Sequence, residues 1–189
     1  MTHSDISHGQ QPRTRVGALL LLTDLDGHLV LIQPRYKEGL FLVGGARHED
    51  ESPREAARRE SKEEIGVEIV PGRKLLDYYS PPNPKSGAEA GVNFVYDGGQ
   101  LTEDQLDSIT LPLDEVLAWD RTDKSQLDHF TTGPHAVIIR AALEARQLNR
   151  HVDLEFARTA RGGLTLLHQI DGHDAVPDLQ VARHAKGVA

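Results

Sequence analysis

The chain has 189 residues, of which 38% are hydrophobic and 26% are charged, a composition typical of one folded domain with a single sizeable core. A net charge of −8, a pI of about 5.6 and an aromatic content of 5% argue against a site for long nucleic acid, which needs basic patches or stacking platforms. The absence of cysteine excludes disulfides and thiolate metal sites.

No apolar run approaches the length of about 18 residues that indicates a membrane helix. The segment Met1–Pro12 is polar and lacks the apolar core of a signal peptide. We therefore expect a cytoplasmic protein with no membrane partner, a flexible tail over residues 1–13 and a loose tail over residues 175–189.

Strand and turn signals along the chain alternate with two helix signals. Two apolar runs flank Asp24-Leu25-Asp26-Gly27, which predicts a hairpin. The glycine pairs at 98–99 and 162–163 predict turns, and the proline-rich segment 80–87 predicts a loop. Strands are predicted at 16–23, 28–33, 40–43, 67–70, 75–79, 92–96, 152–158 and 164–170, and helices at 53–65 and 135–148.

The first predicted helix has start and stop signals at both ends. Ser52 is a suitable N-cap, Pro53 suits the first helical position, and Glu55 completes a capping box. Gly66 can adopt the left-handed conformation that ends a helix. Within the helix, Ser61 is expected to donate its hydroxyl to the Ala57 carbonyl.

Three carboxylates, those of Glu60, Glu63 and Glu64, fall within one narrow sector of this helix, near its C-terminus. Like charges at this spacing cost roughly 0.2 to 0.5 kcal/mol per pair, and the helix dipole adds a further penalty. A solvated helix with ion pairs from Arg59 to Glu55 and Glu63 is one explanation. The other is a site for Mg²⁺ or Mn²⁺, which prefer oxygen ligands and often share their coordination shell with substrate phosphates.

The segment from Gly45 to Val67 resembles the signature of the Nudix hydrolases, G-x5-E-x7-R-E-U-x-E-E-x-G-U, in which U is aliphatic. The fixed positions of the signature are occupied at the right spacing by Gly45, Glu51, Arg59, Glu60, Glu63, Glu64 and Gly66. Departures from its commonest form are Val43, His48, Asp50 and Ser61. The resemblance implies an α/β fold, a Nudix-type α/β/α sandwich with a mixed sheet, over residues 14–148. Outside the resemblance, the strands predicted around the glycine pair at 162–163 indicate a C-terminal hairpin extension over residues 149–174.

The resemblance also implies roles for residues of the signature. Glu60 and Glu64 are expected to bind metal directly, Glu63 to bind it directly or through water, and the carbonyl of Gly45 to be a further ligand. Arg59 resembles the family arginine that holds the acidic side chains in place. Glu51 is its expected ion-pair partner.

Family members often take a general base from a loop well past the signature, and Glu103 is a candidate for that role. The alternative is that Thr102 and Glu103 begin an ordinary helix. Arg35, Lys37 and Arg47 flank the strand that leads into the signature and are candidates for binding substrate phosphate. The alternative for these three is that they only make the protein more soluble.

Other features suit ordinary structural roles. The ten histidines show no zinc-binding spacing and are expected at the surface, although His48 lies near the signature. The aromatic residues of the strands are expected in the core, with one as a possible base-stacking residue. The spacing of Pro81 and Pro82 from the signature resembles that in members that hydrolyse ADP-ribose.

The sequence thus predicts a metal-dependent hydrolase that cleaves the pyrophosphate linkage of ADP-ribose, a nucleotide sugar or a noncanonical nucleoside triphosphate. One alternative is a Nudix-like domain that senses a nucleotide without catalysis and acts through a protein partner. A purely structural domain gives no reason for the acidic cluster. The C-terminal hairpin needs a partner, either the sheet of its own chain or another subunit, and the second alternative predicts a homodimer.

Overall fold

The computed structural model describes residues 13–85, 87–131, 133–160 and 163–172. Apart from residue 13, the two predicted tails lie outside the described residues. Within these ranges no helix combines the length and the apolar character that crossing a lipid bilayer requires.

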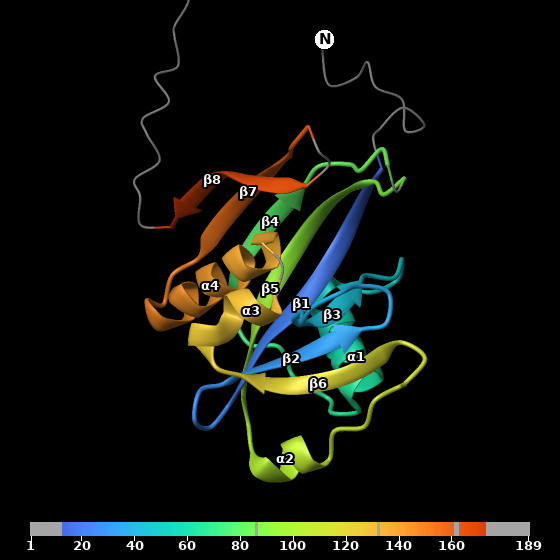
Figure 1. The fold of residues 1–189 in the computed structure, drawn as a ribbon, viewed down its shortest axis with the longest axis vertical. Coiled ribbons are helices and arrows are strands. Elements are labelled where there is room, and N and C mark those ends of the chain that lie inside the picture. Colours follow the sequence, from blue (N-terminus) through green and yellow to red (C-terminus); the bar gives the residue numbers. More distant parts are fainter. Residues whose placement is uncertain (1–12, 86, 132, 161–162, 173–189) are drawn as a thin grey trace, which may run out of the picture.

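A mixed sheet of eight strands forms the centre of the molecule (Figure 1). The strand order is β6-β2-β1-β5-β4-β7-β8, and β3 pairs separately with β1. The strands are β1 (Thr14–Asp24), β2 (Leu29–Pro34), β3 (Val43–Ala46), β4 (Lys74–Ser80), β5 (Ala90–Leu101), β6 (Val116–Thr122), β7 (Val152–Arg158) and β8 (Leu164–Asp171). The helices are α1 (Pro53–Ile65), α2 (Glu103–Asp107), α3 (Leu127–Phe130) and α4 (Gly133–Gln147), with a 3-10 turn η2 (Lys124–Gln126).

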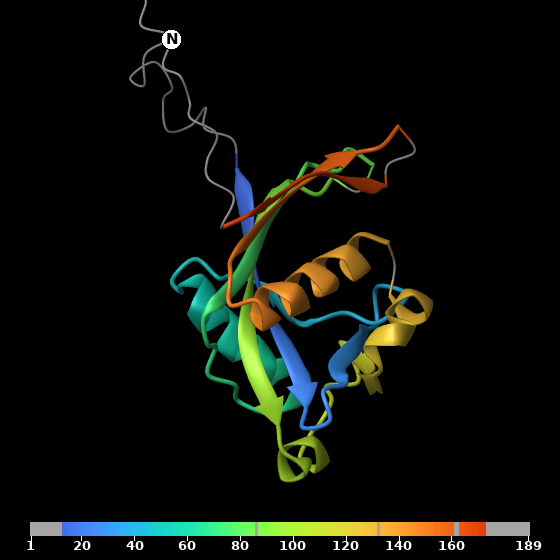
Figure 2. The same ribbon diagram turned by 90° about the vertical axis from the view of Figure 1, so that its left-hand side faces the viewer.

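Helices α1 and α4 cover opposite faces of the sheet (Figure 2). Side chains alternate along a strand, so β1 sends Leu20 and Leu22 toward one apolar cluster and Leu21 toward another. The first cluster includes Ile65 of α1, and the second includes Ile139 of α4. The predicted α/β/α sandwich is therefore confirmed.

Helix α1 begins and ends where the sequence predicts. The Glu55 amide donates to the Ser52 hydroxyl at 3.2 Å, and the Ser52 amide donates to the Glu55 carboxylate at 2.8 Å. Gly66 ends the helix with a φ of 73°. The capping box and the glycine cap thus fix both ends of the helix that carries the acidic cluster.

The segment after α1 differs from the prediction. Residues 67–70 form no strand, because the Ile69 amide donates to the Ser61 hydroxyl at 2.9 Å instead of to a neighbouring strand. Ser61 in turn donates to the carbonyl of Arg58, and the predicted bond to Ala57 is wrong. Ser61 therefore ties the helix to the chain that follows it.

Two further predictions need correction, and one strand was missed. Gly98 and Gly99 do not end a strand but lie within β5, where the register with β1 shifts between Leu21 and Leu22. The strand predicted at 40–43 begins only at Val43, and Phe41 forms a single bridge with β2. Strand β6 was not predicted, because its alternation is weak and it pairs with β2, far away in sequence.

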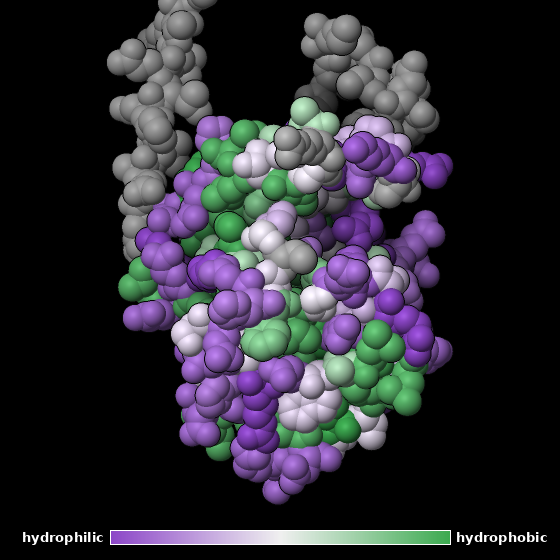
Figure 3. Space-filling model, in the orientation of Figure 1, coloured by the Kyte–Doolittle hydropathy of each residue, from purple (hydrophilic) through white to green (hydrophobic). Residues whose placement is uncertain are grey.

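The predicted C-terminal hairpin forms and extends the central sheet. Strand β7 runs parallel to β4, and β8 is the outer strand. Phe156 packs edge-to-face on Tyr78, with ring centroids 6.1 Å apart, and Arg158 donates to the carbonyls of Pro81 and Pro82. The predicted boundary between a domain at 14–148 and an extension at 149–174 stays a prediction. Apolar and hydrophilic side chains are interspersed over the face of the molecule seen in Figure 3.

Candidate active site

Two glycines of β3 bring the backbone into contact with α1. A Cβ on Gly44, whose φ is 135°, would lie 2.2 Å from the carbonyl oxygen of Ala18. A Cβ on Gly45 would lie 2.5 Å from a carboxylate oxygen of Glu60. The Gly44 amide donates to the Glu64 carboxylate at 2.6 Å. Gly44 therefore lets β3 pair closely with β1, and Gly45 leaves room for the Glu60 carboxylate.

Burial makes Glu60 and Glu64 unusual carboxylates. Burial raises the pKa of Glu64 to about 8, with added repulsion from Glu60 and Glu115, although the Gly44 amide opposes the shift. The pKa of Glu60 is also raised, first by burial, although Arg59 opposes it. A cation close to the carboxylates of Glu60 and Glu64 would therefore stabilise their charged forms.

Arg59 connects four groups around the glycine turn. Its guanidinium lies 2.7 Å from Glu51, 3.0 Å from Glu60 and 2.6 Å from Glu63, and it donates to the Ala46 carbonyl at 3.0 Å. Its hydrogen bonds lower the pKa of Glu51 to about 2, and those same contacts raise its own pKa. Arg59 and Glu51 thus have the positions that the resemblance implies.

The three glutamates are less tightly clustered than their helical spacing predicts. Arg59 donates a hydrogen bond to one oxygen of Glu60 and to one oxygen of Glu63. The Glu63 side chain is 51% exposed, whereas Glu64 is only 9% exposed. The donor set of Glu60, Glu64 and the Gly45 carbonyl nevertheless fits a hard divalent cation. These are oxygen donors, and Glu64 is a buried carboxylate that no cationic side chain of the described residues pairs with.

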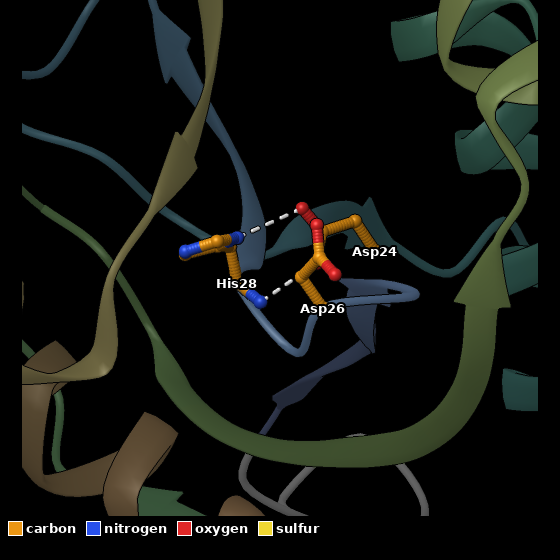
Figure 4. Close-up of side chains that lie close together, drawn as sticks. All are labelled: Asp24, Asp26 and His28. Atoms are coloured by element: carbon orange, nitrogen blue, oxygen red, sulfur yellow. Dashed lines mark hydrogen bonds and ion pairs between the residues drawn. The ribbon is translucent and has the colours of Figure 1, made fainter.

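Among the described residues, two groups of acidic residues and histidine have potential ligand atoms within 4.8 Å of one another, and Glu60, Glu63 and Glu64 do not form such a group. Asp24, Asp26 and His28 lie together at the β1–β2 turn, where His28 donates its amide to Asp24 at 2.8 Å and its ring lies 3.0 Å from that carboxylate (Figure 4). The second group is Asp77, His151 and Asp153, in which Asp77 also pairs with Lys74 at 2.9 Å. In the first group Asp24 and His28 are each other's partners, and in the second Asp77 contacts both Lys74 and His151.

A cavity of about 370 Å³ opens beside Glu64, Gly44 and Gly45 on the sheet face that α4 covers. Its volume lies within the usual range of small-molecule sites, about 300–1,000 Å³. Apolar side chains such as Phe41 and Ile139 line part of it, and Pro134 and His135 at the start of α4 line another part. On the other side of α1, Glu51, Arg59 and Glu63 line a separate and more open hollow of about 450 Å³.

Of the three predicted phosphate-binding residues, only Lys37 lines the cavity beside Glu64. Its ammonium lies over the rings of Tyr36 and Phe41, and its pKa is lowered by burial and by nearby Arg15. Arg35 donates instead to the Leu113 carbonyl. Arg47 donates to the carbonyls of Glu49 and Glu51, so it supports the turn before α1.

Glu103, the candidate general base, lies in the first turn of α2 and forms an ion pair with Arg121 at 2.6 Å. It lines neither the cavity beside Glu64 nor the hollow outside α1. The side chain of Thr102 caps α2 in a capping box with Gln105. This geometry favours the alternative that Glu103 only begins a helix.

The sequence interpretation missed two polar residues of the cavity, Arg15 and Asn93. Arg15 lies at the beginning of β1, where a charged residue is unremarkable. Asn93 could have been noticed, because asparagine is depleted in strands and here stands between Val92 and Phe94.

Comparisons with known proteins agree with this geometry. A family model described as the NUDIX domain matches residues 13–140. The structure resembles the MutT protein from Methanosarcina mazei Go1, with a TM-score of 0.59, 19% identity and coverage of 74% of this chain and 97% of that one. A MutT protein from Bacillus halodurans is similar with a TM-score of 0.59 and 16% identity, over 83% of this chain and 97% of that one. A UDP-X diphosphatase is similar with a TM-score of 0.57 and 16% identity, over 75% of this chain and 66% of that one.

A comparison with curated proteins gave no significant match. The family model nevertheless covers more than half of the chain, including all of the signature from Gly45 to Val67. The solved structures share the same fold. The chain therefore belongs to the Nudix family of pyrophosphohydrolases.

Proposed function

We propose that the protein hydrolyses the pyrophosphate linkage of a nucleoside diphosphate joined to another group, using Mg²⁺ or Mn²⁺ held by Glu60, Glu64 and the Gly45 carbonyl. Glu63 is an additional ligand or a partner through water. The observation that carries the proposal is the buried carboxylate of Glu64, which contacts the Gly44 amide and lines the cavity beside the signature.

Each residue of the signature has a defined task in this proposal. The metal, when bound, neutralises charge on the diphosphate and lowers the pKa of an attacking water. Arg59 holds the carboxylates of Glu60 and Glu63 in place, and Glu51 fixes Arg59 from the opposite side. Gly44 orients Glu64 through its amide. Pyrophosphate cleavage depends mostly on positioning and charge neutralisation, which this arrangement supports.

The proposed substrates are ADP-ribose, a nucleotide sugar or a noncanonical nucleoside triphosphate. The cavity has an apolar wall for a base or sugar and lies next to Glu64, one of the proposed metal ligands. The likeness to a UDP-X diphosphatase is compatible with a nucleotide sugar.

The test is hydrolysis of these three substrate classes with Mg²⁺, Mn²⁺ or excess chelator. We expect metal-dependent turnover by the wild type, and Glu64→Gln should lower kcat at least about 100-fold, because it removes a charged ligand while keeping the shape. Glu144→Gln is the matched control, since Glu144 pairs with Arg150 outside the cavity.

Two results would overturn the proposal. One is equal turnover by the wild type and Glu64→Gln. The other is tight, metal-independent nucleotide binding without turnover of any substrate, which is the behaviour expected of a nucleotide sensor.

We also propose that the protein forms a homodimer through β8. Within the described ranges this strand pairs with β7 on one side only, and it exposes Leu167 and Ile170. Light scattering should then give twice the chain mass, and replacing Ile170 with lysine should shift the mass toward that of a single chain. A single-chain mass for the wild type at micromolar concentration would contradict this proposal.

A further inference from the structure

Asn93 is a buried polar residue on the floor of the cavity beside Glu64. It lies in the middle of β5, is 4% exposed, and its side-chain nitrogen has no hydrogen-bond partner. A buried donor without a partner is unfavourable, so its presence requires an explanation. A bound molecule that accepts a hydrogen bond in the cavity would supply one.

The neighbouring strands fix the orientation of this amide. Asn93 stands opposite Gly17 of β1 and Tyr78 of β4. A Cβ on Gly17 would lie 2.3 Å from the Asn93 side-chain oxygen and 3.5 Å from the Gly45 carbonyl oxygen. Asn93 therefore fits only beside a glycine, and it lies close to the carbonyl that we propose as a metal ligand.

Arg15 is a second donor next to Asn93. Its Nη2 and the Asn93 Nδ2 lie 3.5 Å and 3.4 Å, respectively, from the position that a Cβ on Gly91 would take. An atom placed there would contact both nitrogens. The guanidinium of Arg15 forms no hydrogen bond or ion pair with the described part of the chain, although it lines the cavity.

These donors suit an anionic oxygen. Arginine binds phosphate well because its planar donors match the phosphate oxygens, and an uncharged amide adds direction. Lys37 adds positive charge to the same cavity, where the acidic side chains are Glu64 and Glu89. A phosphate bound by Arg15 and Asn93 would lie in the same cavity as Glu64 and Gly45, as expected for the second phosphate of a diphosphate whose first phosphate lies at α1.

We infer that Arg15 and Asn93 bind the phosphoryl group of the substrate that lies away from α1. This inference rests on the proposed function and adds a binding site for the distal phosphate. It makes Asn93 and Arg15 substrate-binding residues outside the Nudix signature.

The test is an NMR titration of ¹⁵N-labelled protein in EDTA with UMP and AMP, and separately with uridine and adenosine. The side-chain amide resonances of Asn93 are identified by their loss in Asn93→Asp. We expect the monophosphates, but not the nucleosides, to shift these resonances. Arg15→Gln and Asn93→Asp should each weaken monophosphate binding about tenfold or more, since each removes a hydrogen bond to a charged group.

Arg140→Gln is the control, because Arg140 pairs with Asp128 outside the cavity and should bind as the wild type does. If Asn93→Asp fails to fold, Arg15→Gln decides, because Arg15 is exposed. The inference is overturned if the wild type shows no shift, if the nucleosides cause the same shift, or if Arg15→Gln keeps wild-type affinity.

Turnover with Mg²⁺ is measured on the same preparations. Hydrolysis without the expected NMR shift would overturn only this inference. The expected shift without hydrolysis would overturn only the proposed function.

Discussion

Arg59 holds Glu51, Glu60 and Glu63 with one guanidinium, and lysine cannot replace that planar set of donors. We predict that Arg59→Lys lowers kcat about 10- to 100-fold, because the carboxylates that we propose as metal ligands lose their support. Steady-state kinetics with Mg²⁺ measure the effect. Arg58→Lys is the control, since Arg58 pairs with Glu68 at the surface. Equal losses in both variants would contradict the role of Arg59.

His135 makes a prediction about stability and pH. Burial, with a contribution from Lys37, lowers its pKa to about 4, and the ring packs on Phe41 at 4.5 Å. The unfolded chain, with a histidine pKa near 6.5, therefore binds this proton more readily than the folded chain. The stability from neutral His135 is complete above pH 6.5 and is lost as pH falls toward 4.

Between pH 7 and pH 5 this loss should be about 2 kcal/mol in the free energy of unfolding, measured with urea. His135→Gln has no titrating group at this position. Its free energy of unfolding should therefore fall by about 2 kcal/mol less than that of the wild type over the same pH interval. Identical pH dependence in the two proteins would mean that His135 is not buried as a neutral ring.

At the residue scale, local spacing decided what the sequence could predict. Glu60 and Glu64 could be recognised in the sequence as candidate metal ligands because one helix carries both. The partners of Arg35 and Glu103 are Leu113 and Arg121, and such distant pairs leave no signal in spacing. Arg15 and Asn93 are also far apart in the sequence, and only the folded sheet brings them together.

The C-terminus of α1 depends on Gly66. Its φ is 73°, and a Cβ there would lie 2.2 Å from the hydroxyl of Thr110. We predict that Gly66→Ala lowers the free energy of unfolding by about 1 to 3 kcal/mol, from conformational strain and from the displaced Thr110. Gly87 has the same φ with no atom within 4 Å, so Gly87→Ala measures the strain alone. Urea denaturation should show the larger loss for Gly66→Ala, and equal losses would exclude a role for Thr110.

At the element scale, α1 was predictable because its capping box and glycine cap lie within the segment itself. Residues 67–70 were wrongly predicted as a strand from their β-branched composition. The hydrogen bond from the Ile69 amide to the Ser61 hydroxyl, which prevents strand pairing there, leaves no signal in the sequence. Strand β6 depends on pairing with β2. Local sequence therefore determines helix ends better than it determines strand partners.

The C-terminal hairpin is part of the main sheet at the scale of the whole molecule. Phe156 is 2% exposed and packs on Tyr78 of β4. We predict that Phe156→Ala costs about 3 to 5 kcal/mol in thermal or urea unfolding, because it leaves a cavity in the shared core. Leu148→Ala, just after α4, should cost less than about 1 kcal/mol, since that side chain is 50% exposed. A small effect of Phe156→Ala would show that the hairpin is a separate unit.

The layered architecture was predictable from alternating strands and helices together with the signature. The strand order was not, because β1 pairs with β5, and β4 with β7, across long stretches of sequence. Those pairings build the cavity, since they place Arg15 beside Gly91 and bring Arg158 of β7 to its rim.

The central claim is that buried carboxylates of α1 bind a divalent ion next to the glycine turn. Isothermal titration calorimetry with Mn²⁺ tests it most directly, using the wild type, Glu64→Gln and, as control for the acidic group at the β1–β2 turn, Asp24→Asn. We predict that Glu64→Gln removes Mn²⁺ uptake seen in the wild type and that Asp24→Asn retains it. Equal uptake by Glu64→Gln and the wild type, or uptake lost only in Asp24→Asn, would contradict the claim.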